Sequence, residues 1–153
     1  MTILLVVLIL AAAAVGGPVV RADRTVGDLR LEMTVAKASF QPGEPVGITM
    51  RVINVSGAPV TVTTGGQQYD VLVRQRGALV WQWSHDKAFT QAVRTIEMPP
   101  GDTRSYQTSW DQRDLQGRAV EPGAYEVSCV LMTGQRSGPQ SAEVGPIRIT
   151  IAR

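Results

Sequence analysis

The sequence predicts an all-β protein: a single immunoglobulin-like antiparallel β-sandwich of about seven to nine strands after an N-terminal signal peptide or anchor. Three observations lead to this fold class. The chain has 153 residues, the size of one ordinary domain. Beyond residue 28, apolar residues alternate with polar ones, as in strands that bury one face. Turn signals containing Pro and Gly recur between the alternating stretches.

The N-terminal segment is apolar. Residues 3–20 hold no charged side chain, and the stretch is close to the roughly 20 residues that a membrane span needs. Gly16-Gly17-Pro18 would break a helix ahead of a cleavage site after Ala22. We therefore expect residues 1–22 to be a signal peptide or an uncleaved membrane anchor, and residues 28–153 to form the β-sandwich. This predicts an exported protein, either secreted or held at the cell envelope through residues 3–20.

Each predicted strand is a set of apolar residues at alternate positions. Pro-Gly pairs stand between several of the sets, where Pro presets φ for the first turn residue and Gly accepts a positive φ at the second. Residues 86–93 lack the alternation, and we expect a loop there, with a short helical turn, of a length that often carries function. The sets begin at Leu29, Val46, Val60, Tyr69, Leu79, Tyr125 and Ile147.

Charge and composition exclude several classes of function. The 15 Lys and Arg residues nearly balance the 13 Asp and Glu residues and form no basic run, so we expect no nucleic-acid partner. His85 is the only histidine, which leaves no set of ligands for a metal and no base with an orienting partner. We therefore expect no enzymatic activity, no metal and no cofactor. Cys129 alternates with apolar neighbours, which predicts a buried thiol.

Two tryptophans stand two residues apart on one predicted strand. Trp81 and Trp83 would then point to the same face of the sheet. They either fill the sandwich core or form an exposed platform that stacks on a sugar or contacts a protein partner.

Several motifs together are more specific than the composition. A glycine-glutamine-tyrosine-aspartate element lies at 66–73, a Trp-x-Trp-Ser element at 80–84 and a Phe-Thr-Gln-Ala element at 89–92. Further motifs lie at 52–60, 100–111 and 122–127. Across about residues 30 to 133, the series resembles the BsuPI family of intracellular proteinase inhibitors from bacilli.

The resemblance implies an immunoglobulin-like sandwich that binds a subtilisin-type serine proteinase and blocks it by surface contact. An inhibitor of this kind needs a rigid frame and one presented loop, and residues 84–92 fit that description. Phe89 could fill an apolar pocket, or it could lie with Gln91 under the sandwich as part of a folding signature. The alternative function is a non-inhibitory binding or structural module of the cell envelope. The candidate partner-binding residues are Trp83, Ser84, His85, Phe89, Thr90 and Gln91.

Overall fold

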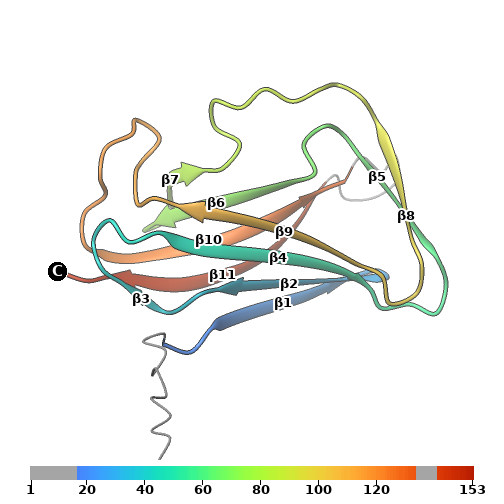
Figure 1. Ribbon diagram of the computed structural model, residues 1–153, viewed down its shortest axis with the longest axis horizontal. Helices are drawn as coiled ribbons and strands as arrows, with labels where there is room; N and C mark the ends of the chain where they lie inside the picture. The colour runs from blue at the N-terminus through green and yellow to red at the C-terminus, as the bar shows by residue number, and fades with distance from the viewer. Residues whose placement is uncertain (1–16, 134–140) are drawn as a thin grey trace, which may run out of the picture.

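The computed structural model describes residues 17–133 and 141–153, and this part of the chain is all-β (Figure 1). It contains eleven strands, more than the sequence predicts. The strands are β1 (Val20–Val26), β2 (Leu29–Val35), β3 (Ser39–Phe40), β4 (Val46–Asn54), β5 (Val60–Thr64), β6 (Tyr69–Gln75), β7 (Ala78–Gln82), β8 (Arg94–Met98), β9 (Thr103–Trp110), β10 (Gly123–Met132) and β11 (Ser141–Ile151).

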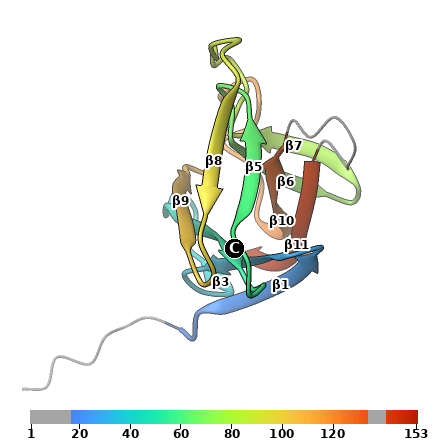
Figure 2. The same cartoon turned by 90° about the vertical axis from the view of Figure 1, so that its right-hand side faces the viewer.

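Two sheets face each other across one hydrophobic core (Figures 1 and 2). One sheet has the strand order β1-β2-β4-β9 and the other has the order β3-β11-β10-β6-β7. All pairs in these sheets are antiparallel except β3 with β11. A separate two-stranded sheet of β5 and β8 stands at one end of the molecule. In Figure 2 this sheet faces the viewer.

The predicted alternation builds the core. Every second residue of β4 is buried, as is every second residue of β2 from Leu31 onward, and Met33 pairs with Met50 across the two strands. Burial of this apolar surface is the main driving force for folding. The largest fully buried side chains are Trp110, Tyr125 and Phe40.

Two of the strands that the sequence analysis missed, β8 and β9, bury few of their residues. β9 has the sequence Thr-Arg-Ser-Tyr-Gln-Thr-Ser-Trp and buries only Trp110 fully. β8 buries only Met98. Such strands form because backbone hydrogen bonds to a neighbouring strand, rather than side-chain burial, decide their conformation.

β1 includes residues that the sequence analysis assigned to the leader. Val20 to Ala22 pair with Val35 to Met33 of β2. The cleavage site predicted after Ala22 therefore falls inside a paired strand. Residues 1–16 of the predicted signal peptide or anchor lie outside the described residues.

No helix in the described part of the chain is long and apolar enough to cross a membrane.

Asn54 at the end of β4 ties the two-stranded sheet to the sandwich. Its buried side-chain amide donates hydrogen bonds to the carbonyl oxygens of Ala58 and Met98, at 2.7 and 2.9 Å. Its side-chain oxygen accepts from the backbone N–H of Ser56 at 2.9 Å. One side chain thus satisfies groups of the turn that leads into β5 and of the end of β8.

Candidate functional site

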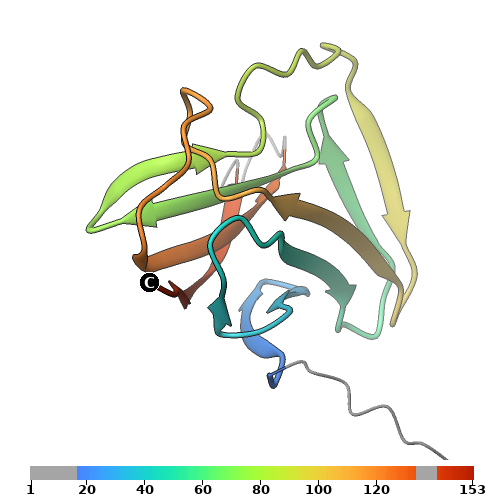
Figure 3. The ribbon, with the colours of Figure 1, turned by 60° about the vertical axis from the view of Figure 1, so that its left-hand side comes forward.

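All six predicted site residues lie on the connection between β7 and β8, residues 83–93 (Figure 3). The connection leaves the edge of the five-stranded sheet and crosses to the two-stranded sheet. It begins with tight turns, in which the His85 N–H donates to the Gln82 carbonyl and the Lys87 N–H to the Ser84 carbonyl, both at 3.1 Å. Beyond Lys87 the backbone has no regular structure before β8.

A buried carboxylate fixes the start of this connection. Asp70 on β6 is 4% exposed. It accepts hydrogen bonds from the Ser84 hydroxyl at 2.6 Å, the Ser84 N–H at 3.1 Å and the Gln82 amide at 2.7 Å. The Gln67 amide and the Val71 N–H donate to the same carboxylate, at 3.1 and 2.9 Å. Five donors compensate the desolvation of a group that would otherwise be costly to bury.

An aromatic stack supports the next part. The Trp83 ring lies on the Tyr69 ring with centroids 4.3 Å apart, and the Tyr69 ring lies on that of Tyr106 at 4.8 Å. The Phe89 ring lies 5.8 Å from the Trp83 ring and is tilted against it by 44°. The Lys87 ammonium lies 5.2 Å from the centre of the Trp83 ring, a cation–π distance. Phe89 is half-buried, so its ring is engaged within the protein.

Thr90 packs against a glycine. A Cβ placed on Gly66 would lie 2.3 Å from the Thr90 carbonyl oxygen and 2.8 Å from the Thr90 nitrogen. Only a residue without a side chain fits here, because a methyl group would overlap the backbone of Thr90. The Gly-Gln-x-Tyr-Asp element therefore contacts the connection at three points, through Gly66, Tyr69 and Asp70.

The part between Thr90 and β8 is exposed. Gln91, Ala92 and Val93 all face solvent, and Val93 is 73% exposed. Among the described residues, no backbone hydrogen bond involves residues 88–93. Regular pairing resumes at Arg94, which lies opposite Thr64 of β5.

The structure separates the six predicted residues by burial. Trp83, Ser84 and Phe89 are half-buried and pack onto the frame, which agrees with the folding-signature alternative for Phe89. Thr90 is exposed, although its backbone contacts Gly66. His85 and Gln91 face solvent, so Gln91 is not tucked under the sandwich. The His85 Nε2 atom lies 3.1 Å from the Asp86 carboxylate, which is itself 86% exposed.

The sequence analysis did not predict that Val93 is exposed. Its only signal was an aliphatic residue in a stretch without alternation, bounded by a polar strand. Such a residue looks the same in the sequence whether it is buried or exposed.

The two tryptophans do not form a common exposed face. Trp83 lies beyond the end of β7, in the turn, and stacks on Tyr69. Trp81 remains on β7, with its ring centroid 6.4 Å from that of the buried Trp110. Both side chains are half-buried and pack against the core, so neither stands free as a stacking platform.

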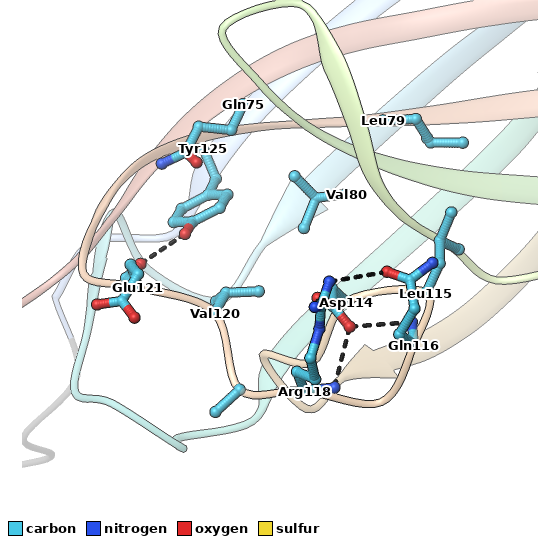
Figure 4. Close-up of a pocket in the computed structure, with 11 residues that line it drawn as sticks. Gln75, Leu79, Val80, Asp114, Leu115, Gln116, Arg118, Val120, Glu121 and Tyr125 are labelled. Atoms are coloured by element: carbon cyan, nitrogen blue, oxygen red, sulfur yellow. Dashed lines mark hydrogen bonds and ion pairs between the residues drawn. The ribbon is translucent and has the colours of Figure 1, made fainter.

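Two pockets flank the loop that follows β9. One, of about 540 Å³, lies between the β6–β7 hairpin and residues 114–121, with Leu79, Val80 and Val120 among its apolar lining (Figure 4). The other, of about 410 Å³, lies between the same loop and the turn at Trp83 to Lys87.

The loop between the pockets is held by Asp114. Its carboxylate accepts hydrogen bonds from the backbone N–H groups of Gln116 and Arg118, each at 2.9 Å, and from the Arg118 guanidinium at 3.0 Å (Figure 4). These hydrogen bonds, led by the one from the Arg118 backbone, hold the pKa of Asp114 below its usual value. The Leu115 N–H next to it donates to the Val80 carbonyl of β7 at 3.0 Å.

The described residues offer neither a metal cluster nor a reactive thiol. Across residues 17–133 and 141–153, no three His, Cys, Asp or Glu residues cluster so that they could hold a metal. Cys129 is buried, as predicted, and desolvation raises the pKa of its thiol to about 12. A thiol with that pKa is not a nucleophile at neutral pH.

Comparison with known proteins identifies the family of the chain. A family model described as BsuPI, intracellular proteinase inhibitor, matches residues 33–136. No curated protein matches the chain. The family description contradicts the prediction of an exported protein, secreted or held at the cell envelope, because it places these inhibitors inside the cell.

Solved structures are similar to this chain at low identity. The C-terminal domain of Wzt is 12% identical, with a TM-score of 0.51 over 88% of this chain and 78% of that one. The CARDB domain of a Pyrococcus furiosus protein is 15% identical, with a TM-score of 0.45 over 82% of this chain and 94% of that one. A β-glucosidase from Erythrobacter marinus is 16% identical, with a TM-score of 0.44 over 88% of this chain. The chain spans only 15% of the β-glucosidase.

Proposed function

Because the chain belongs to the BsuPI family of intracellular proteinase inhibitors, we propose that it blocks a subtilisin-type serine proteinase by surface contact through residues 83–93. The observation that carries this proposal is the way the connection is held. Hydrogen bonds to Asp70, the aromatic stack and the Gly66 contact fix its first part, while its last part faces solvent. A loop ordered before binding loses little conformational entropy in the complex, which favours affinity.

The six candidate residues have two roles in this proposal. Trp83, Ser84, Phe89 and Thr90 hold the connection in its shape. His85 and Gln91 face outward and contact the proteinase. In this proposal the protein acts by occupying a surface of the proteinase, so inhibition requires no catalytic group and no cofactor.

We also infer that the sandwich is of the immunoglobulin-like type. Two mainly antiparallel sheets over one shared core support this inference, as does the likeness to the Wzt domain at a TM-score of 0.51.

The alternative function was a non-inhibitory module of the cell envelope. It depended on export, which the family description contradicts. Its sugar-stacking form also depended on exposed tryptophans, and both are half-buried against the core.

The test is an inhibition assay with the purified chain. Increasing amounts are added to a subtilisin-type serine proteinase that cleaves a chromogenic peptide, and a cysteine proteinase and a metalloproteinase serve as class controls. We expect saturable inhibition of the serine proteinase at or below about micromolar concentration. No inhibition of any subtilisin-type enzyme tested would contradict the proposal.

A matched pair of variants tests the site. Gln91→Ala removes an exposed side chain from the connection, and Gln107→Ala removes one from β9. Gln91→Ala is expected to weaken inhibition and Gln107→Ala to leave it unchanged. Equal inhibition by both variants would show that Gln91 makes no important contact.

A further inference from the structure

We propose that Gln91–Val93 is the segment that enters the substrate cleft of the proteinase, with Val93 as the side chain that fills its specificity pocket. The partner would then be a proteinase whose pocket accepts an aliphatic side chain. This inference rests on the proposed inhibition, but the residue that it places in the specificity pocket, Val93, is not one of the six candidates.

The first argument is the chain length between two fixed points. Arg94 lies opposite Thr64 in the β5–β8 ladder, and Thr90 packs against Gly66. The step from Thr64 to Gly66 covers two residues, about 7 Å of extended backbone. The step from Thr90 to Arg94 covers four residues, about 13 Å when extended. Gln91–Val93 must therefore bow outward opposite the single residue Gly65.

The second argument is that the bowed segment has unused backbone groups. Among the described residues, no backbone hydrogen bond involves residues 88–93, and Gln91 to Val93 face solvent. A segment with free N–H and C=O groups can pair with a second chain as an added strand does. A cleft that binds peptide substrates in extended form offers such groups.

The third argument concerns which side chain is available. Val93 is 73% exposed, more than any other large hydrophobic side chain in the described part of the protein. Phe89 could also fill an apolar pocket, but its ring packs 5.8 Å from that of Trp83 and is half-buried. Moving Phe89 into a proteinase would break that contact, whereas Val93 needs no rearrangement.

The experiment uses substitutions at Val93 with a matched control. Val93→Ala is expected to raise the inhibition constant about tenfold or more, because a hydrophobic pocket loses affinity with each methyl group removed. Val93→Asp should weaken inhibition by about a hundredfold or more, since it places an unpaired carboxylate in that pocket. Val55→Ala and Val55→Asp are the controls, because Val55 is also exposed, at 50%, but lies in the turn between β4 and β5.

A change of specificity tests the role more sharply than a loss of binding. Val93→Lys should weaken inhibition of the subtilisin-type enzyme and create inhibition of a trypsin-like proteinase, whose pocket carries an aspartate. Thermal unfolding of each variant shows whether the frame is intact. A purely structural role for Val93 would not transfer inhibition from one enzyme to the other.

The outcomes separate this inference from the proposed function. If the wild type inhibits and Val93→Asp inhibits equally well, the inference is wrong and the inhibitory function stands. If the wild type does not inhibit, the inhibitory function is wrong, and limited proteolysis with mass spectrometry tests the segment directly. A first cut between Gln91 and Arg94 would then support entry of this segment into the cleft, and a first cut elsewhere would overturn it.

Discussion

Asp70 and Ser84 are joined by two hydrogen bonds, from the Ser84 N–H to Oδ1 at 3.1 Å and from the Ser84 hydroxyl to Oδ2 at 2.6 Å. The residues belong to different parts of the chain, β6 and the turn after β7. A carboxylate buried inside the frame therefore sets where the candidate binding loop begins.

Asp70→Asn should destabilise the protein by about 2–4 kcal/mol. The substitution replaces one carboxylate oxygen, which accepts hydrogen bonds, by an NH₂ group, which can only donate and would face other donors. Urea unfolding measures the change. Asp86→Asn is the matched control, since the Asp86 side chain is 86% exposed and lies in the same turn. Equal stability of the two variants would contradict the importance of the buried network.

Gly66→Ala should destabilise the protein and displace Thr90, because the new methyl group would lie 2.3 Å from the Thr90 carbonyl oxygen. Gly65→Ala is the control, since a Cβ there meets no atom within 4 Å. Thermal unfolding and the amide NMR shifts of residues 88–93 report the two effects. Shifts that stay the same in Gly66→Ala would mean that the connection does not depend on this contact.

Cys129 should resist thiol reagents in the folded protein. Its side chain is buried and desolvation raises the pKa to about 12, so at about pH 8 the reactive thiolate is scarce and shielded. Labelling with a chromogenic disulfide reagent should be slow in buffer and rapid in denaturing urea. Rapid stoichiometric labelling of the folded chain would show that Cys129 is accessible.

Acid should loosen the loop around Asp114. The pKa of Asp114 is lower in the folded protein than its ordinary value of 3.8, chiefly because of the hydrogen bond from the Arg118 backbone. Its stabilising contribution is therefore present above that ordinary value and is lost as the pH falls through the folded pKa. A carboxyl-detected NMR titration should give a midpoint below 3.8 for Asp114.

The Asp114→Asn variant is the control for that titration. It should show a loosened Arg118 amide even at neutral pH, without the acid-dependent change. A midpoint at or above 3.8 in the wild type would contradict the predicted stabilisation.

The sequence predicted the fold where burial alternates. Leu31 and Met33 of β2, and the matching positions of β4, follow the two-residue period that one buried face imposes. It did not predict β9, where only Trp110 is fully buried, because the hydrogen bonds that hold an edge strand leave little trace in composition.

The sequence predicted where the connection lies but not how its residues are arranged. The missing alternation located the connection, and the motifs indicated that Ser84 and Phe89 matter. Whether a motif residue faces inward or outward depends on contacts with distant residues such as Asp70 and Gly66. Those contacts arise only when the chain folds, so Val93 could not be distinguished from a buried valine.

The hydrogen bond from the Leu115 N–H to the Val80 carbonyl bears on aggregation at high protein concentration. β7 is the last strand of its sheet, and an uncovered outer strand is a template on which a second copy could add and start a fibre. The loop after β9 occupies an acceptor on that strand, so this side of the molecule is guarded against aggregation by its own backbone.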